Sequence, residues 1–141
     1  MIFTSRNFGK MRKHIAQSDD YDFEEKMKKL LFGRKIIKAE QLDGQSAMLT
    51  LDNGTELLAV GNEGCGGCSN GWYYLDELNT CDNAITKIEC VVDSGEYGDD
   101  IYHIFVYAED KKINCLQYSG GDNGYYGTGY DLYVTVTEET P

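Results

Sequence analysis

The chain has 141 residues and one proline, at its last position, which fits a single domain and excludes a proline-rich linker. No apolar run approaches the roughly 18 residues that a membrane helix needs. The first residues, MIFTSRNFGKMRKH, lack the apolar stretch of a secretory signal, so we expect a cytoplasmic protein that does not associate with membranes.

The net charge of −11 is divided unevenly along the chain. Residues 1–38 carry 10 Lys and Arg against 5 Asp and Glu, which gives +5. Residues 39–141 carry 3 against 19, which gives −16. Such asymmetry is typical of proteins that act by interaction. We therefore divide the chain into a basic helical arm, residues 1–20, and an acidic domain, residues 21–141.

Two helices are predicted at the N-terminus. In RNFGKMRKHIAQ, residues 6–17, the helical period places Phe8, Met11 and Ile15 on one face and basic side chains opposite. In YDFEEKMKKLLFG, residues 21–33, four apolar residues form a stripe, with acidic residues in the first turn and lysines near the end. An aspartate at position 20 or 22 can cap this second helix, and a glycine at position 33 is placed to end it.

After the second helix the pattern changes to that of strands. Asp43-Gly44 and Asn53-Gly54 separate three apolar runs, and such pairs are strong hairpin signals. Four later runs, at residues 85–92, 101–109, 112–118 and 125–136, also read as strands. The segment GWYYLDELNTCDNA, residues 71–84, receives no assignment. The sequence thus predicts an α+β fold, with two N-terminal helices followed by a mostly antiparallel sheet of about six or seven strands.

The five cysteines are expected to be thiols or metal ligands in a reducing compartment, since their number is odd. Cys65 and Cys68 form a C-x-x-C pair in a glycine-rich loop and could bind one zinc ion together with Cys81 and Cys90. The spacing matches no familiar zinc motif, and Cys90 also fits an apolar strand face. We therefore favour a tight loop with partly buried thiols, and we expect no cofactor.

No catalytic motif is found. His14 lies in the basic segment, and His103 shares a predicted strand face with Ile101, Phe105 and Tyr107, where a packed side chain is more common than a base. The chain lacks G-x-S-x-G, H-E-x-x-H, phosphate-loop and EF-hand patterns. These observations favour a binding protein over an enzyme.

The segment SGGDNGYYGTGYDLYV, residues 119–134, places glycines inside a predicted strand. By alternation, Gly127 and Gly129 share a face with Tyr125 and Tyr133, and they form a shallow trough between these two rings. A backbone, a helix or a flat ligand could approach this trough. Alternatively, an aromatic side chain of a neighbouring strand covers the glycines; candidates for the cover are Tyr118 and Trp72.

The basic arm could bind phosphates. Arg6, Lys10 and Lys13, at i, i+4 and i+7, would line up along one side of a helix. The acidic domain would repel a polyanion, so direct binding of nucleic acid is not expected. We favour docking of the arm on its own acidic domain or on that of a second chain. Its apolar stripe then predicts a homo-oligomer that assembles through the arm.

Residues 31–136 resemble a family of uncharacterised proteins that are encoded by bacteriophages and prophages and classed as a domain of unknown function. The resemblance rests on LFGRKIIKAEQL, LTLDNGTELLAV, GCGGCSNGWYYL and GGDNGYYGTGYDLYV. It assigns no catalytic residues and does not cover the basic arm. It implies a small accessory phage protein that acts in the host cytoplasm.

Three functions are compatible with this resemblance. The leading expectation is an inhibitor of a host defence protein, similar to an anti-CRISPR protein, whose acidic surface binds a basic nucleic-acid site. The acidic residues expected to make this contact are Asp93, Glu96, Asp99 and Asp100. An alternative is a protein that sequesters a nucleotide-like signal, with phosphate bound by the arm and bases stacked on Tyr125, Tyr126, Tyr130 and Trp72. A third is a zinc-stabilised structural or regulatory module.

Overall fold

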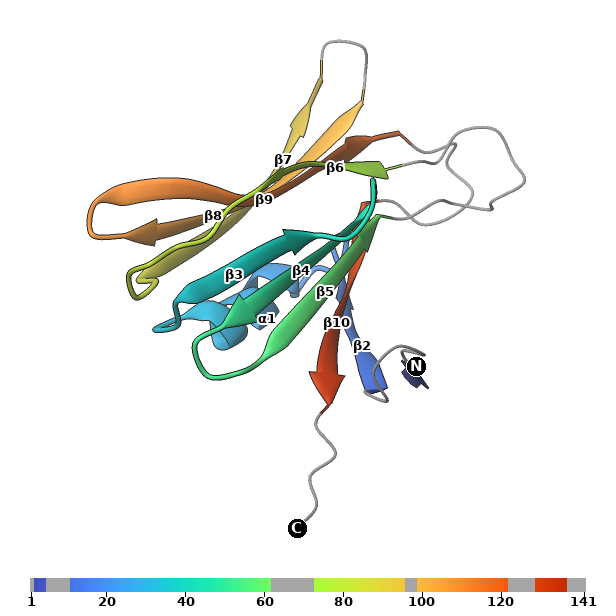
Figure 1. The fold of residues 1–141 in the computed structure, drawn as a ribbon. Helices are drawn as coiled ribbons and strands as arrows, with labels where there is room; N and C mark the ends of the chain where they lie inside the picture. The colour runs from blue at the N-terminus through green and yellow to red at the C-terminus, as the bar shows by residue number, and fades with distance from the viewer. Residues whose placement is uncertain (1, 5–10, 62–72, 96–98, 122–128, 137–141) are drawn as a thin grey trace.

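The computed structural model describes residues 2–4, 11–61, 73–95, 99–121 and 129–136 (Figure 1). These residues form ten strands and one helix. In chain order the elements are β1 (Ile2–Thr4), β2 (Met11–Gln17), α1 (Phe23–Leu31), β3 (Ile36–Gln41), β4 (Ser46–Leu51), β5 (Glu56–Gly61), β6 (Tyr73–Leu78), β7 (Lys87–Ser94), β8 (Asp100–Ala108), β9 (Lys111–Gly120) and β10 (Tyr130–Val136).

The strands form two separate antiparallel sheets. The large sheet has the order β1-β2-β10-β5-β4-β3, and the small sheet has the order β6-β9-β8-β7. The prediction of one sheet of six or seven strands is therefore wrong, although a strand is present at each of the seven predicted places. Six of them agree with the prediction within two residues at each end, whereas the last begins only at Tyr130, and the predicted residues 125–128 lie outside the described residues. The segment left unassigned supplies β6, which pairs with β9.

A single apolar core is shared by the two sheets and the helix. The buried side chains alternate along the strands, as in Leu57 and Ala59 of β5 and Ile104 and Val106 of β8. Helix α1 contacts β7 of the small sheet and β2 of the large one, so it lies where the two sheets diverge (Figure 1). The described part of the chain contains no helix with the length and apolar character needed to span a bilayer.

The second predicted helix is confirmed. Phe23, Met27 and Leu31 are buried along one side of α1, and acidic and basic residues lie at its first and last turns as expected. Asp22 is at the N-cap position, although its side chain makes no capping hydrogen bond. Gly33 has φ +78° and follows the C-cap residue Phe32, as its helix-ending role requires.

The first predicted helix is wrong. Residues 11–17 form β2, which pairs with β10 and with β1. The pairing with β10 contains a register shift between Leu132 and Tyr133, and this irregularity hides the simple alternation of a strand. Residues 6–10 of the predicted helix lie outside the described residues, and so does its Phe8.

Both predicted hairpin turns are present. Asp43 lies within the β3–β4 connection, and its carboxylate accepts hydrogen bonds from the backbone N–H groups of Gln45 and Ser46, both at 2.8 Å. The hydrogen bond from Gln45 lowers the pKa of Asp43. The second turn has Gly54 at φ +91°, a conformation that suits glycine.

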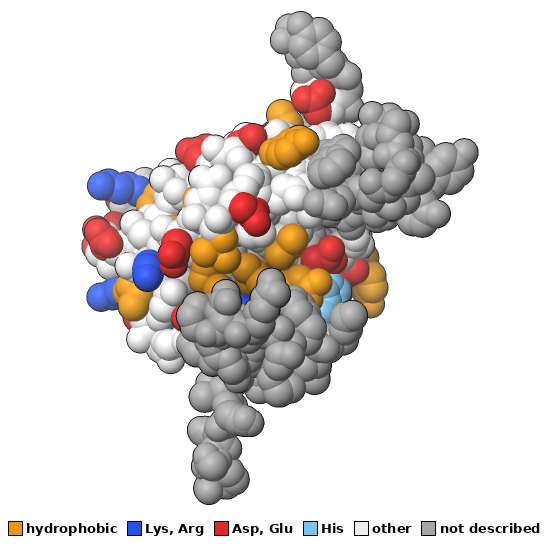
Figure 2. Space-filling view, turned by 45° about the vertical axis from the view of Figure 1, so that its right-hand side comes forward, with side chains coloured by type: hydrophobic (Ala, Val, Ile, Leu, Met, Phe, Trp, Pro, Cys, Tyr) orange, Lys and Arg blue, Asp and Glu red, His pale blue; other side chains and the backbone are white. Residues whose placement is uncertain are grey.

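The outer face of the large sheet carries a cross-strand row of apolar and aromatic residues. Met48 pairs with Leu58, Leu58 with Tyr133, and Tyr133 with His14, across four adjacent strands. Figure 2 shows hydrophobic side chains gathered in the middle of this face, with acidic side chains around them. Met48 and Leu58 are buried but do not belong to the shared core.

Candidate functional site

The outer face of the small sheet is the first candidate site, and it is acidic. Residues 73–120, which contain this sheet, carry ten carboxylates and three lysines. Side chains that do not face the core lie on the outside of the sheet, and the carboxylates among them include Asp76, Glu77, Glu89 and Asp93. Asp76, Glu77 and Asp93 are exposed. We call this surface the acidic face.

A hydrogen-bonded network fixes the middle of the acidic face. His103 Nε2 lies 3.1 Å from Asp93 Oδ2, and His103 Nδ1 lies 3.3 Å from Asn114 Nδ2. Asn114 also donates to Glu77 Oε1 at 3.0 Å, and Gln117 donates to Asp76 Oδ2 at 3.0 Å. These contacts therefore hold the three carboxylates in defined positions on the surface.

Two of the three lysines near this face are engaged with aromatic rings. Lys112 Nζ lies 4.2 Å from the centroid of Phe105, and Lys87 Nζ lies 4.8 Å from that of Tyr107. The Tyr107 hydroxyl donates to Glu89 Oε1 at 2.8 Å, which raises the pKa of Tyr107. Lys87 and Lys112 thus lie over rings instead of forming ion pairs with the network carboxylates.

Three of the four predicted acidic residues are described, and they lie on β7, on β8 or in the connection between these strands. Asp93 is exposed and pairs with His103, and Asp99 is half-buried. Asp100 Oδ2 accepts a hydrogen bond from the Tyr73 hydroxyl at 2.9 Å. Glu96 lies outside the described residues. Sequence reasoning treated this turn as the whole acidic site and missed the carboxylates of β6, because residues 71–84 received no assignment.

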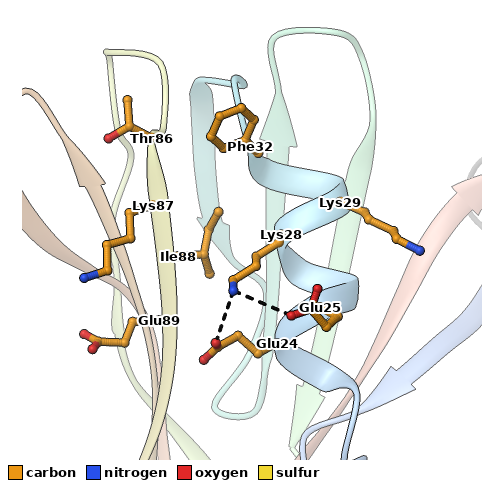
Figure 3. A pocket seen from close by; sticks show the side chains of 9 residues that line it. All are labelled: Glu24, Glu25, Lys28, Lys29, Phe32, Thr86, Lys87, Ile88 and Glu89. Atoms are coloured by element: carbon orange, nitrogen blue, oxygen red, sulfur yellow. Dashed lines mark ion pairs between the residues drawn. The ribbon is translucent and has the colours of Figure 1, made fainter.

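A groove between α1 and β7 borders the acidic face (Figure 3). Its volume is about 670 Å³, and it is lined by Glu24, Glu25, Lys28, Lys29, Phe32, Thr86, Lys87, Ile88 and Glu89. Phe32 lies at one end of the groove and is 63% exposed, whereas Ile88 is buried. The groove therefore combines an apolar floor with a charged rim.

The charges of this groove are mostly paired within the protein. Lys28 Nζ lies 3.6 Å from Glu24 Oε2 and 3.6 Å from Glu25 Oε2, as the dashed lines in Figure 3 show. Glu24 Oε1 accepts the backbone N–H of Cys90 at 2.9 Å and so ties the helix to β7. Lys29 points away from this groove toward the other side of the helix (Figure 3).

A second groove lies on that other side, between α1 and β2. Its volume is about 380 Å³, and its lining is basic and apolar: Lys13, His14, Ile15, Lys26, Lys29 and Leu30. Lys26 Nζ is held by two aspartates, at 3.6 and 3.7 Å, and donates to the Ile15 carbonyl. Neither Lys13 nor Lys29 has an ion pair with any residue that the structure describes. We call this the basic groove.

Of the three basic residues predicted to bind phosphate, the structure describes Lys13 alone, and it lies on β2 in this groove. Arg6 and Lys10 lie outside the described residues. The amphipathic helix that motivated self-association is replaced by a strand over residues 11–17. Homo-oligomer formation through the arm stays a prediction.

Of the predicted stacking residues, the structure describes Tyr130 alone, and this ring is buried. It stacks on Tyr118 with centroids 4.6 Å apart and meets Phe23 and Tyr102 edge-on. Burial raises its pKa well above the ordinary value. Trp72, Tyr125 and Tyr126 lie outside the described residues. Tyr130 belongs to the core and offers no open ring for a ligand.

The trough that the glycines predict is occupied at Gly129. This residue has φ +69°, and a Cβ atom there would collide with the Ser18 side chain and lie 3.1 Å from Tyr102 Cζ. Ser18 Oγ accepts the N–H of Tyr130 at 3.0 Å. The close neighbour at Gly129 is thus a segment of the same chain. Gly127 lies outside the described residues.

The described cysteines are structural thiols. Cys81 and Cys115 are buried, and Cys81 Sγ donates to the Asn83 carbonyl at 3.3 Å. Burial, together with the nearby Glu24, raises the pKa of Cys90 to about 12, so this thiol is not poised as a nucleophile. Among the described side chains no group of three or more could hold a metal ion. Cys65 and Cys68 lie outside the described residues, so the expectation that zinc is absent stays a prediction.

The two sheets and the one helix of the described residues form a small β-rich domain. The chain belongs to the family described as a domain of unknown function, DUF7448, which matches residues 29–132. The resemblance to an uncharacterised family is thereby confirmed, and the match begins within α1 and ends in β10. No curated protein and no solved structure matches the chain.

Proposed function

We propose that the protein is a non-enzymatic accessory protein that binds a basic surface of a partner protein through its acidic face. One observation carries this proposal: carboxylates outnumber lysines by ten to three over residues 73–120, and the described network holds several of them in position. A surface of one sign raises the rate of association with a partner of opposite sign.

The resemblance to phage-encoded proteins suggests what the partner does. A nuclease or another nucleic-acid-binding defence protein must present a basic surface to its substrate. The acidic face would compete with the nucleic acid for that surface, in the manner of an anti-CRISPR protein. The setting would be the cytoplasm of a bacterial host.

This proposal is tested by expressing the protein in bacteria that carry a CRISPR or another anti-phage system and measuring phage plating. The expected result is a rise in plating efficiency in a defended strain and no change in an undefended one. The partner is then recovered by crosslinking, and nucleic acid should displace the protein from it. Unchanged plating in every defended strain, with no partner that nucleic acid displaces, would refute the proposal.

The basic groove favours a second candidate function, the sequestration of a nucleotide-like anionic signal. Lys13 and Lys29 could contact phosphate, and the side chains of Ile15 and Leu30 offer an apolar wall. Isothermal titration with cyclic dinucleotides and nucleoside triphosphates tests it directly. Binding that Lys13→Gln and Lys29→Gln abolish would favour this function over inhibition by the acidic face.

A further inference from the structure

Strand β7 forms an open edge of the small sheet. Among the described strands it pairs with β8 alone, and the register is unbroken from Lys87 to Ser94. Backbone N–H and C=O groups of successive residues in a strand point to opposite sides. Every second residue of β7 therefore directs its hydrogen-bonding groups away from β8.

One hydrogen bond identifies which residues these are. The backbone N–H of Cys90 donates to Glu24 of α1, so this N–H group points away from β8. By alternation, the backbone N–H and C=O groups point the same way at Ile88, Val92 and Ser94. Among the described residues, no backbone hydrogen bond outside the sheet is found for these groups. The helix covers the first half of the strand, whereas Val92, in the second half, is 56% exposed.

The second half of β7 also lacks most of the usual protections of an edge strand. Natural edges are blocked by charged side chains, lysine above all, or by proline, a bulge or a covering segment, and here Asp93 is the one charged side chain. Residues 91–94 read VVDS and contain neither lysine nor proline, and the register there has no bulge. The charge beside this edge is negative, because Asp93 is exposed and Asp100 pairs with Ser94 across the β7–β8 ladder.

We propose that the edge of β7 from Val91 to Ser94 accepts an extended, basic segment of the partner protein as an added strand. Strand addition supplies affinity through main-chain hydrogen bonds, and the neighbouring side chains supply specificity. Lysines of the added segment would lie beside Asp93 and the acidic face. The inference that the added segment is basic rests on the proposed function. The inference that β7 can accept a strand rests on its open edge alone.

A proline scan separates the main-chain contribution from that of the side chain. Proline at Val92 removes an N–H group that points away from β8, so the β7–β8 ladder stays intact. The matched control is Val92→Ala, which shortens the side chain but keeps the N–H. Ser94→Pro repeats the test at the next outward position if the first variant does not fold, as judged by circular dichroism.

The probe is a labelled ten-residue peptide of alternating lysine and valine, and its binding is followed by fluorescence anisotropy. We expect the proline variant to bind at least about tenfold more weakly than wild type, and Val92→Ala to stay within about twofold, as loss of one or two backbone hydrogen bonds predicts. Amide hydrogen exchange should show new protection at Val92 and Ser94 in the wild type.

The outcomes distinguish this inference from the proposed function. If Asp76→Asn with Glu77→Gln abolishes peptide binding while Val92→Pro leaves it unchanged, the acidic face stands and strand addition is wrong. If only the proline variant loses binding, strand addition stands without the acidic face. A peptide that does not bind the wild type, or that protects amides of another strand, contradicts the inference.

Discussion

Gly129 shows how a single residue can be essential for a reason that sequence pattern only half reveals. A glycine in a predicted strand indicates a close approach, and the structure confirms one. The approaching residue is Ser18, which is 111 positions away in the chain and precedes α1. Local pattern contains no information on such a distant neighbour. The predicted aromatic alternative is met in part, because the ring of Tyr102, on β8, also lies close to Gly129.

We predict that Gly129→Ala destabilises the protein more than Gly54→Ala. Both glycines have positive φ, and an alanine there costs about 1–2 kcal/mol. At Gly54 nothing lies within 4 Å of the added Cβ, whereas at Gly129 the Ser18 side chain must move and release the N–H of Tyr130. The total loss in the free energy of unfolding for Gly129→Ala should reach about 3 kcal/mol. Urea unfolding measures both, and equal losses would show that the contact with Ser18 is unimportant.

We also predict that stability falls as the pH rises above about 9, the ordinary pKa of a cysteine thiol. Cys90 keeps its proton in the folded state up to a pKa of about 12, whereas in the unfolded chain it loses the proton from about 9. The folded state therefore binds more protons between these values, and its stability is lost progressively across that window. Below pH 9 the contribution of Cys90 is fully present. Burial raises the pKa values of Cys115, Tyr118 and Tyr130 in the same direction.

Urea unfolding at pH 8, 9, 10 and 11 tests this dependence. Each group with such a raised pKa can lower the free energy of unfolding by up to about 1.4 kcal/mol per pH unit. The control is Cys90→Ala, whose stability should decline less steeply between pH 9 and 10 than that of the wild type. Parallel curves for the two proteins would mean that Cys90 is not buried as the structure places it.

At the scale of elements, seven of the ten described strands and α1 could be predicted because their signals are local. Helix α1 has a regular apolar period, charges suited to its dipole and a glycine at its end. The hairpins of β3, β4 and β5 are marked by Asp43-Gly44 and Asn53-Gly54. Strand β2, MRKHIAQ, could not be predicted for two reasons. Its pairing with β10 contains a register irregularity, and this partner strand lies over 100 residues later in the chain.

The contact between α1 and β7 yields a prediction at the same scale. Glu24→Ala should lower the free energy of unfolding by about 1–2 kcal/mol, because it leaves the N–H of Cys90 without its acceptor. Glu24→Gln keeps an acceptor oxygen and should recover most of this loss.

The matched control is Glu25→Ala on the next position of the helix. The Glu25 side chain is 69% exposed, and its ion pair with Lys28, at 3.6 Å, is a surface pair that should contribute less than about 0.5 kcal/mol. Chemical denaturation compares the three variants. Equal losses for the two alanine variants would show that Glu24 stabilises the protein only through charge.

At the scale of the whole molecule, the charge asymmetry of the sequence becomes a separation of surfaces. The basic groove is formed by β2 and α1, whereas the acidic face belongs to the small sheet. Composition alone predicted a basic and an acidic part. It could not predict that β2 joins the large sheet beside β10 instead of forming a separate helical arm, because that depends on long-range pairing.

The same long-range pairing explains why one predicted sheet became two. Every strand of the second half of the chain except β10 lies in the small sheet, and β10 returns to pair with β5 and β2. Local turns determine which strands are neighbours within a hairpin. The return of the last strand depends on the core that Tyr130 and Leu132 complete, and no local signal marks it.

The central claim, that the acidic face binds a basic partner, is tested most directly by association rates measured in stopped flow with the recovered partner. The test variant is Asp76→Asn, Glu77→Gln, Asp93→Asn, which keeps side-chain acceptors for the described network and removes three charges. The control is Glu40→Gln, Asp52→Asn, Glu56→Gln, which removes three charges from the large sheet and the turn that follows β4.

Both variants change the net charge of −11 by the same amount, so only the position of the charges differs. Because screening acts over about 8 Å at physiological salt, charges close to the contact should govern the rate. We predict that the test variant associates at least about tenfold more slowly than wild type at low salt and shows a weaker salt dependence, while the control stays within about twofold. Equal rates and equal salt dependence for the test variant and the control would contradict the account.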